Sequence, residues 1–505
     1  MNLKIRAAKN VGAMWLNLLV HGAVGFFLSP FILHRLGNEL FSLWVLIFSL
    51  TGYCGILDLG IRTATVRYVA KCSEAGDQDQ LARFVSTSLG FYCAIALFSL
   101  ILTAIGYLYL PRVFNISPTD LEDARLLFLI AGVGVALSFP LSLFSGVLEG
   151  LQRFDSLGLT QVGLTLFRGL LIVIALKSGG KLLAIGGITV GLNLLSYVIF
   201  MCMARRHMPV SLSLRHLDGN TFREMIRYGA FAFVILVAEK LRFQSDAIVI
   251  GAFVSTAAIA SFSIASKLVE YSTYAVRSMA QIFTPMSSQF HAARDFARLR
   301  HTLVAGNRAC ALIVFPVCII LIILGKSILE VWAGATYVSS YPVLVTLVIP
   351  RTIYLAQSTS IKILMGMAEH RMLALVLLVE GVANVALSIL FVGRFGVVGV
   401  ALGTAIPLFG TSLLFLPHHI ARHLDIPLRT FLGRSYLLPA ALCVPLSGVL
   451  LFVRQEFPVH GYHGLILQLA CGGVVYCAGL SFVVFSWVPG SSRSWGAVAQ
   501  VLKPR

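Results

Sequence analysis

Residues 84–110 read FVSTSLGFYCAIALFSLILTAIGYLYL and contain no charged side chain. A helix that crosses the hydrocarbon core of a bilayer needs about 20 predominantly apolar residues, because the core is about 30 Å thick and each helical residue rises about 1.5 Å. This stretch is long enough and apolar enough to span a membrane. The fold is therefore decided by how many stretches of this kind the chain contains.

Hydropathy along the 505 residues predicts about fourteen such spans, and thus an all-α integral membrane protein. Helices of about 21 residues at these positions leave little chain for a folded domain outside the membrane. The predicted spans are Val11–Leu33, Phe41–Ile61, Phe84–Leu110, Arg125–Leu148, Gly158–Leu176, Leu182–Met203, Tyr228–Phe253, Ala257–Thr284, Ala309–Gly325, Tyr341–Met365, Met372–Gly393, Val397–Pro417, Leu437–Val453 and Gly464–Val488.

The composition of the chain agrees with this fold class. Hydrophobic residues make up 58% of the sequence and charged residues 12%, whereas an ordinary soluble domain has about 25% charged residues. This balance excludes an ordinary soluble enzyme and a disordered chain. It also excludes a nucleic-acid binder, which gathers its basic residues on a patch that faces water.

The distribution of basic residues predicts the orientation in the membrane. Lys and Arg number 39 against 21 Asp and Glu, which gives a net charge of +18. With the N-terminus inside, the segments predicted to be cytoplasmic hold 24 of the 39 basic residues, and the predicted external loops hold 8. Because cytoplasmic loops are enriched in Lys and Arg, both termini are expected in the cytoplasm. Most of the net charge therefore sets the orientation and does not mark a ligand site.

Short similarities between the two halves indicate an internal repeat, as in many transporters. The predicted inner turn LEGLQR at 148–153 corresponds to LMGMAE at 364–369, and about 35 residues later a GxxxG pair at 187–191 corresponds to one at 399–403. Such glycine pairs also occur at ordinary contacts between membrane helices, which is the alternative interpretation. The order of the matches predicts two six-helix lobes: an N-lobe at 1–203, a cytoplasmic linker at 204–227, a C-lobe at 228–417, and two further helices with a cytoplasmic tail at 418–505.

Charged residues inside the predicted spans gather on two of them. A charged side chain at mid-bilayer costs about 2.5–3.5 kcal/mol on insertion scales, so it is expected to face a cavity or a partner. Seven of twelve intramembrane charges lie in Tyr228–Phe253 and Ala257–Thr284, and polar residues of the second span recur at steps of three and four along one helix face. We expect this face to line a hydrated cavity that receives an anion. The cationic candidates are Lys240, Arg242, Lys267 and Arg277, and the candidate coupling or ion-pair acids are Glu239, Asp246, Glu270 and Asp58.

The same residues also have a purely structural interpretation, in which they form ion pairs that only hold helices together. Arg62, His21 and Tyr274 are secondary cavity candidates, and Arg168 and Arg351 have no obvious partner. The sequence contains no metal-ligand cluster and no cofactor motif, so neither a metal nor a cofactor is expected. The pairs that spacing or predicted depth suggests are Glu239 with Arg242, Lys267 with Glu270, Asp58 with Arg62, and Lys362 with Glu380.

Several stretches carry a family resemblance. They resemble the polysaccharide transporter family, the flippases of lipid-linked oligosaccharides within the multidrug/oligosaccharidyl-lipid/polysaccharide exporter superfamily. The resemblance covers essentially the whole chain, including the number of spans. The stretches are SPFILHRLG at 29–37, FSLW at 41–44, LDLG at 57–60, RYVA at 67–70, DAIVIG at 246–251 and RFGVVG at 394–399.

The resemblance implies two lobes arranged in a V, with the first, second, seventh and eighth spans lining a central cavity. It implies a flippase that moves polyprenyl-diphosphate-linked oligosaccharide repeat units from the cytoplasmic to the outer leaflet by alternating access, for surface polysaccharide assembly. Bases of the seventh and eighth spans would then neutralise the diphosphate. The implied protein is not an enzyme and is a multi-pass monomer of the bacterial inner membrane. Its partners would be the lipid-linked oligosaccharide and the bilayer, with glycan polymerase machinery as a further candidate and no nucleic acid.

Two alternatives stay open at this point. A cation-coupled multidrug exporter of the same superfamily would depend on the acids more than on the bases. A membrane-embedded glycan polymerase or ligase would need a long external catalytic loop, and the longest predicted external loops are only residues 111–124 and 326–340.

Overall fold

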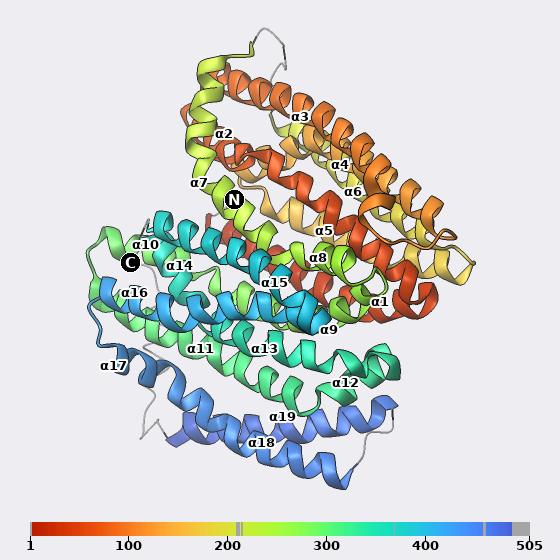
Figure 1. Cartoon of the computed structure of the whole chain (residues 1–505). Helices are drawn as coiled ribbons and strands as arrows, with labels where there is room; N and C mark the ends of the chain where they lie inside the picture. Colours follow the sequence, from red (N-terminus) through yellow and green to blue (C-terminus); the bar gives the residue numbers. More distant parts are fainter. Residues whose placement is uncertain (1–2, 209–212, 214–215, 368, 458–460, 487–505) are drawn as a thin grey trace.

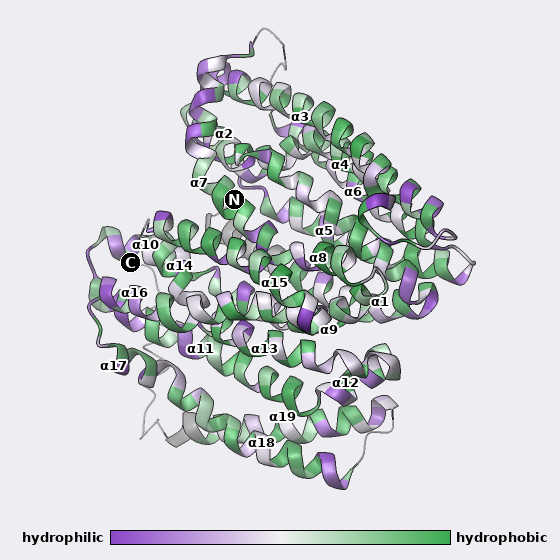
Figure 2. Cartoon of the chain, in the orientation of Figure 1, coloured by the Kyte–Doolittle hydropathy of each residue, from purple (hydrophilic) through white to green (hydrophobic). Residues whose placement is uncertain are grey.

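The computed structural model describes residues 3–208, 213, 216–367, 369–457 and 461–486. Throughout these residues the regular secondary structure is helical. Apolar residues dominate the long helices, and polar residues gather at helix ends and at a few internal positions (Figure 2). This is the distribution expected of helices that satisfy their backbone groups internally within a bilayer.

The helices of the first half form an N-terminal lobe, whose members α2 to α6 lie in the upper part of Figure 1. The first element, α1, consists of two helices that meet at Gly37, where φ is 78° and ψ is 174°. The positive φ is a value that glycine adopts without steric penalty. The elements are α1 (Leu3–Tyr53), η1 (Cys54–Asp58), α2 (Ile61–Ala75), α3 (Gln78–Val113), α4 (Leu121–Gly150), α5 (Phe154–Lys177) and α6 (Leu182–His207).

The second half forms a C-terminal lobe in the lower part of Figure 1. It too contains a long helix with a glycine kink, at Gly396. Its elements are α7 (Gly219–Phe243), α8 (Ser245–Phe253), α9 (Ala258–Ala280), α10 (Phe283–Ala292), α11 (Phe296–Ile323), α12 (Gly325–Ala333), η3 (Ala335–Ser340), α13 (Tyr341–Ala356), α14 (Ser358–Gly366), α15 (His370–Gly410), η4 (Thr411–Phe415) and α16 (Leu416–His423).

The last helices pack on the C-terminal lobe and lie along the lower edge of Figure 1. Helix α18 contacts both α19 and α11, and the Tyr476 hydroxyl donates a hydrogen bond of 2.8 Å to the main-chain oxygen of Leu312. These elements are α17 (Leu428–Leu432), η5 (Gly433–Leu437), α18 (Leu438–Glu456) and α19 (Gly461–Ser486).

The predicted spans fall on these helices wherever the structure describes them. Ten segments among the described residues are long and apolar enough to cross a membrane. Two of them, Trp15–Asp58 and Arg371–His423, each contain two predicted spans, because α1 and α15 each consist of two helices that meet at a glycine with non-helical backbone angles. The predicted spans outside these ten segments are the polar ones, Tyr228–Phe253 and Ala257–Thr284.

Helix α7 connects the two lobes. Its first half packs against α2 and α3, where Tyr68 donates a hydrogen bond of 2.9 Å to Glu224 and Met225 is fully buried, and its second half packs along α15. At the crossing with the N-terminal lobe, a methyl group on Gly60 would overlap the main chain of Gly229, and one on Gly229 would lie 2.7 Å from the oxygen of Gly60. The predicted boundary between linker and C-lobe thus falls inside a helix that contacts both lobes.

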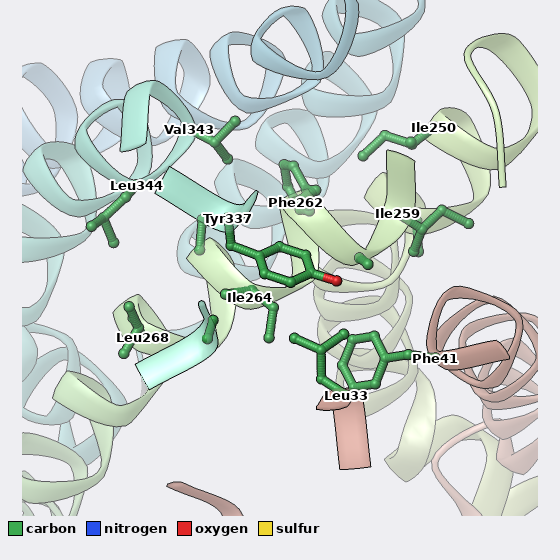
Figure 3. Close-up of a cluster of buried hydrophobic side chains, with 14 of the residues drawn as sticks. Leu33, Phe41, Ile250, Ile259, Phe262, Ile264, Leu268, Tyr337, Val343 and Leu344 are labelled. Atoms are coloured by element: carbon green, nitrogen blue, oxygen red, sulfur yellow. The ribbon is translucent and has the colours of Figure 1, made fainter. Parts of the chain in front are cut away.

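A large hydrophobic cluster joins the lobes at one end of the molecule. It gathers Leu33 and Phe41 of α1 with Ile259 and Ile264 of α9 and with Tyr337 of η3 (Figure 3). Phe41, Ile259 and Ile264 have no exposed surface. Burying apolar side chains in this way holds the two lobes together at this end.

Hydrogen bonds between the lobes accompany this cluster, and we call them the latch. Asn38 of α1 donates a bond of 3.0 Å to the main-chain oxygen of Ala257 and accepts one of 3.2 Å from the Tyr337 hydroxyl. Ser42 donates to the same oxygen of Ala257 at 3.3 Å. The Trp332 indole N–H donates to the main-chain oxygen of Phe26 at 3.0 Å. Asn38, Trp332 and Tyr337 lie in connections that are predicted to be external, and Ser42 and Ala257 are close to the ends of predicted spans that adjoin such connections.

Candidate functional site

A central cavity of about 550 Å³ lies between the lobes, where α1 faces α7, α8, α9, α13 and α15. This volume falls within the usual range of small-molecule sites, about 300–1,000 Å³. Four basic side chains line the cavity, together with two acids. They are Arg242, Lys267, Arg277 and Arg351, and Asp246 and Glu270.

The first base, Arg242, is paired. Its Nε lies 2.7 Å from a carboxylate oxygen of Glu380 on α15, and both side chains are almost fully buried. The contact is an ion pair by distance, although the N–H is not aligned with the oxygen as in a hydrogen bond. The guanidinium also lies over the ring of Tyr354, 4.4 Å from its centroid. This pair corrects two expected pairings, since neither Glu239 nor Lys362 forms an ion pair with these residues.

The cavity also contains two guanidinium groups that lack a carboxylate partner within the described part of the chain, those of Arg277 and Arg351. Arg351 of α13 is 9% exposed, and its Nη2 lies 3.5 Å from the Thr273 hydroxyl. Its guanidinium lies 4.7 Å from the centroid of the Phe243 ring. Arg277 of α9 is exposed within the cavity wall. Two cations without counter-ions in a membrane protein indicate a site for an anion.

A buried acid also lines the central cavity. Asp246 at the start of α8 accepts a hydrogen bond of 3.0 Å from the Thr404 hydroxyl of α15. Asn384, also on α15, donates 3.2 Å to that hydroxyl and 3.3 Å to the main-chain oxygen of Arg242. Asp246 is therefore held in a polar network that includes the backbone of a base lining the cavity.

A second, smaller cavity of about 290 Å³ lies beside the first. It is lined by residues of α1, α5, α6 and α9. We call it the side cavity. It shares Trp44, Lys267, Glu270 and Tyr274 with the central cavity, so these four side chains form the common wall. Arg168 of α5 also lines the side cavity.

Lys267 stands at the junction of the two cavities and the interface between the lobes. Its Nζ donates a hydrogen bond of 3.2 Å to Ser29 of α1 and lies 5.2 Å from the ring centroids of both Phe41 and Trp44. The helices approach closely here, since a methyl group on Gly25 of α1 would lie 3.4 Å from the ring of Tyr271. Lys267 of the C-terminal lobe therefore contacts the N-terminal lobe directly.

The structure places the predicted residues in three groups. The central cavity contains Arg242, Lys267, Arg277, Asp246, Glu270 and Tyr274, and the side cavity adds His21, whose ring centroid lies 6.2 Å from that of Tyr274. Lys240 and Glu239 line neither cavity; Lys240 lies near Gly55 of η1, and Glu239 is exposed.

Asp58 and Arg62 form the third group and are not paired with each other, which corrects the expected pair. Asp58 accepts a hydrogen bond of 2.6 Å from the Tyr92 hydroxyl. Arg62 forms an ion pair of 2.7 Å with Glu149 and donates to Ser145 at 2.9 Å. The reason is the turn at Leu59 and Gly60, both with positive φ, which interrupts the helix that would have aligned the two side chains. Both residues lie within the N-terminal lobe and outside the two cavities.

Reasoning from the sequence did not select Arg351, Arg168, Trp44 or Thr404 as lining residues. Arg168 and Arg351 lie in predicted spans without an obvious partner, and the free-energy cost of an unpaired charge in a bilayer is the signal that could have selected them. Trp44 and Thr404 carry no charge, so only the packing of the helices reveals their position.

Comparisons with known proteins agree with this architecture. Residues 7–291 match the family described as "Polysaccharide biosynthesis protein". The chain is 20% identical over 386 residues to a protein of Shigella flexneri named "Putative O-antigen transporter", covering 76% of this chain and 90% of that protein. It is 22% identical over 431 residues to the "Uncharacterized membrane protein EpsK" of Bacillus subtilis (strain 168), covering 84% of each.

Solved structures share the fold at low sequence identity. A structure of the lipid II flippase MurJ in an inward closed conformation matches with a TM-score of 0.73 at 16% identity, over 96% of this chain and 99% of that chain. An inward-facing multidrug resistance MATE family transporter of the MOP superfamily matches with a TM-score of 0.67 at 16% identity, over 84% and 99%.

The family match and the transporter relative, together with the shared fold, identify the chain as a membrane transporter or flippase of the MOP superfamily, and not an enzyme. Since the family match covers more than half of the 505 residues, the chain belongs to the polysaccharide biosynthesis protein family.

Proposed function

We propose that the protein flips polyprenyl-diphosphate-linked oligosaccharide units from the cytoplasmic to the outer leaflet of the bacterial inner membrane. The observation that carries this proposal is the set of three guanidinium groups in one cavity, those of Arg242, Arg277 and Arg351. Guanidinium binds phosphate oxygens through two parallel hydrogen bonds and keeps its charge when buried. Glu380 neutralises one of the three, which leaves two for a diphosphate with about two negative charges.

In this proposal the head group enters the central cavity while the polyprenyl tail stays in lipid. With both termini in the cytoplasm, as the basic loops predict, the latch lies on the external side, and the described state has that side closed. Rocking of the lobes would break the latch and release the head group outside. The protein works as a monomer with both termini in the cytoplasm, and hands its product to the glycan polymerase machinery.

Two driving forces are consistent with the arrangement. Moving one negative charge outward is favourable by about 2.3 kcal/mol per 100 mV of membrane potential, negative inside. Asp246 is the acid best placed to couple a proton or sodium ion, because it is buried on the central cavity and bonded to Thr404. Glu239 is exposed and lines neither cavity.

The proposal is tested by flipping of a defined lipid-linked oligosaccharide in proteoliposomes. Arg277→Ala should reduce the initial rate about tenfold or more, since charge-assisted hydrogen bonds of this kind contribute about 1.5–3 kcal/mol. Arg205→Ala is the matched control, because Arg205 is exposed at the end of α6 and lines neither cavity. Equal rates for wild type and Arg277→Ala would remove the basis of the proposal.

The alternative is a cation-coupled multidrug exporter, which the MATE similarity and the buried Asp246 favour. In that case cells that express the protein should gain resistance to cationic drugs, and Asp246→Asn should abolish it. Drug export without any flipping of the lipid-linked oligosaccharide would establish this alternative.

A further inference from the structure

Lys267 of α9 is a cation whose contacts all belong to the opposite lobe. It forms no ion pair with any residue that the structure describes, and its one hydrogen bond among those residues, of 3.2 Å, goes to Ser29 of α1. Its ammonium also lies 5.2 Å from the ring centroids of Phe41 and Trp44 of α1. Neutral groups of the N-terminal lobe therefore hold this charge. The side chain is only half-buried and lines the central cavity, so a bound anion can reach it.

Lys267 lies halfway along α9 between the latch and the anion site. Ala257, whose main-chain oxygen belongs to the latch, precedes it by ten residues, and Arg277 follows it by ten, each about 15 Å along the helix axis. Phe41, one of its ring partners, has no exposed surface and belongs to the hydrophobic cluster that joins the lobes (Figure 3). Lys267 therefore connects the central cavity with the surface at which the lobes must separate.

We infer that Lys267 couples binding of the diphosphate in the central cavity to separation of the lobes. This inference rests on the proposed function and adds the step by which the substrate starts the rocking motion. In the closed state, Ser29 and the two aromatic rings hold the ammonium against α1. When α1 withdraws, these contacts are lost, and a phosphate oxygen of the substrate replaces them. Lysine suits this role, because its ammonium sits on a flexible stem and can redirect its three donors.

The bound anion should favour the state in which the lobes are separated. A ligand shifts a conformational equilibrium only if it binds one of the two states more tightly. The hydrogen bond from an ammonium to a phosphate is charged on both sides, so it is stronger than the bond to the neutral Ser29 hydroxyl. The phosphate thus offsets the contacts with α1 that separation breaks. Without an anion those contacts are lost with no such replacement, which keeps the empty protein closed.

Glu270 is the competing partner for the ammonium. It follows Lys267 by three residues on α9 and lines the same two cavities, but its carboxylate lies beyond ion-pair distance in the closed state and accepts a hydrogen bond of 3.4 Å from Tyr274. Because Glu270 and Lys267 move together on one helix, Glu270 is near in both states and independent of substrate. It therefore weakens the response to substrate and cannot produce that response.

The experiment measures the distance between nitroxide labels on the two lobes at the external end. The labels are attached at Thr119→Cys and Thr336→Cys, both exposed, in the full-length protein without its nine native cysteines. The probe is farnesyl diphosphate, and farnesol, which carries the same tail without the charge, is the matched control. Saturating farnesyl diphosphate should raise the ratio of separated to closed protein about fivefold or more, the lower limit of typical coupling between two sites. Farnesol should leave the ratio unchanged.

Two substitutions of Lys267 test its role. Lys267→Gln should lose the change in distance, whereas its affinity for farnesyl diphosphate, measured by equilibrium binding, should fall by only a few fold because Arg277 and Arg351 still line the cavity. Lys267→Arg keeps the charge and should retain the change. A residue with a merely structural role would not separate binding from the change in distance in this way.

Three variants at other positions complete the design. Ser29→Ala removes the hydroxyl that holds the ammonium in the closed state, so it should raise the separated population without ligand and still respond to farnesyl diphosphate. Glu270→Gln removes the competing carboxylate and should enlarge the response. Arg205→Ala is the control, which should behave as the labelled parent because Arg205 lies outside both cavities.

The outcomes separate this inference from the proposed function. A Lys267→Gln protein that responds as the parent does overturns the coupling role and leaves the flippase intact, and so does a parent that binds farnesyl diphosphate without any change in distance. If Lys267→Gln fails to fold, Ser29→Ala decides, because an unchanged separated population in that variant also overturns the role. Failure of the labelled parent to bind farnesyl diphosphate contradicts the proposed function itself.

Discussion

The guanidinium of Arg242 and the carboxylate of Glu380 lie 2.7 Å apart, although 137 residues separate them in the chain. One belongs to α7 and the other to α15, and neither is accessible to solvent outside the cavity. Thr411 donates a further hydrogen bond of 2.6 Å to Glu380. The pair therefore joins the helix that connects the lobes to the core of the C-terminal lobe.

Removing one member of this pair should destabilise the protein more than removing both. Glu380→Ala leaves the Arg242 charge buried without a partner, which costs about 3–5 kcal/mol in comparable buried pairs. The double variant Arg242→Met/Glu380→Leu should recover most of this loss. Thermal unfolding in detergent measures the order of stability, and a double variant less stable than Glu380→Ala would contradict the prediction.

The bases of the central cavity should differ in their effect on transport. Arg351→Ala and Arg277→Ala should each reduce flipping about tenfold or more, because both guanidinium groups lack a carboxylate among the described residues. Lys240→Ala should have a smaller effect, since Lys240 lines neither cavity. Proteoliposome rates at matched protein content provide the measurement, and a larger effect at Lys240 would reassign the anion site.

The close crossing of Gly60 and Gly229 should not tolerate a side chain. Gly229→Ala places a methyl group 2.7 Å from a main-chain oxygen and should separate α7 from the N-terminal lobe, with a marked loss of folded protein. Gly76→Ala is the control for backbone strain alone, because φ is 70° there and the space around it is open. Gly76→Ala should lower the free energy of unfolding by only about 1–2 kcal/mol. Similar yields of folded protein for both variants would count against a tight crossing.

Locking the latch should stop transport if the lobes must separate at that end. We expect an Asn38→Cys/Ala257→Cys pair, in a background without the nine native cysteines, to lose transport on oxidation and regain it on reduction. Either single variant, treated in the same way, is the control. Undiminished flipping by the fully crosslinked protein would show that this end stays closed throughout the cycle.

Asp246, one of the two acids that line the central cavity, should affect the coupling of transport to an ion gradient separately from the binding of substrate. Asp246→Asn retains a hydrogen-bond acceptor for Thr404 but removes the charge, so stimulation by an imposed proton or sodium gradient should be lost. Glu74→Gln, at an exposed position of α2, is the matched control. An unchanged response to both gradients in Asp246→Asn would leave membrane potential as the driving force.

The sequence predicts the helical framework well and the partners of charged residues poorly. Hydropathy is a local property, so the spans could be located from the residues themselves, including the separate spans on either side of Gly37 and of Gly396. Ion pairing is not local. Spacing favoured Glu239 for Arg242, but the partner comes from a distant helix whose position only the packing of α7 against α15 determines.

The candidate site was predicted in part for the same reason. The polar face of α9 correctly placed Lys267, Glu270, Tyr274 and Arg277 along a cavity, because the periodicity of one helix is sufficient for that. Arg168 could be recognised as a costly charge but not as part of a second cavity. That cavity exists because α5 and α6 pack beside α1, an arrangement that no single stretch of sequence encodes.

The latch has a consequence for how the family can vary. In the bonds from Asn38, Ser42 and Trp332 to the opposite lobe, the acceptor is a main-chain oxygen, that of Ala257 or Phe26. A main-chain acceptor survives almost any exchange of its side chain. The residues at positions 257 and 26 can therefore be substituted in relatives without compensating substitutions at the donor positions. Coevolution signals should therefore be weak between these donors and their acceptor positions, and within the latch they are expected only between Asn38 and Tyr337, whose bond joins two side chains.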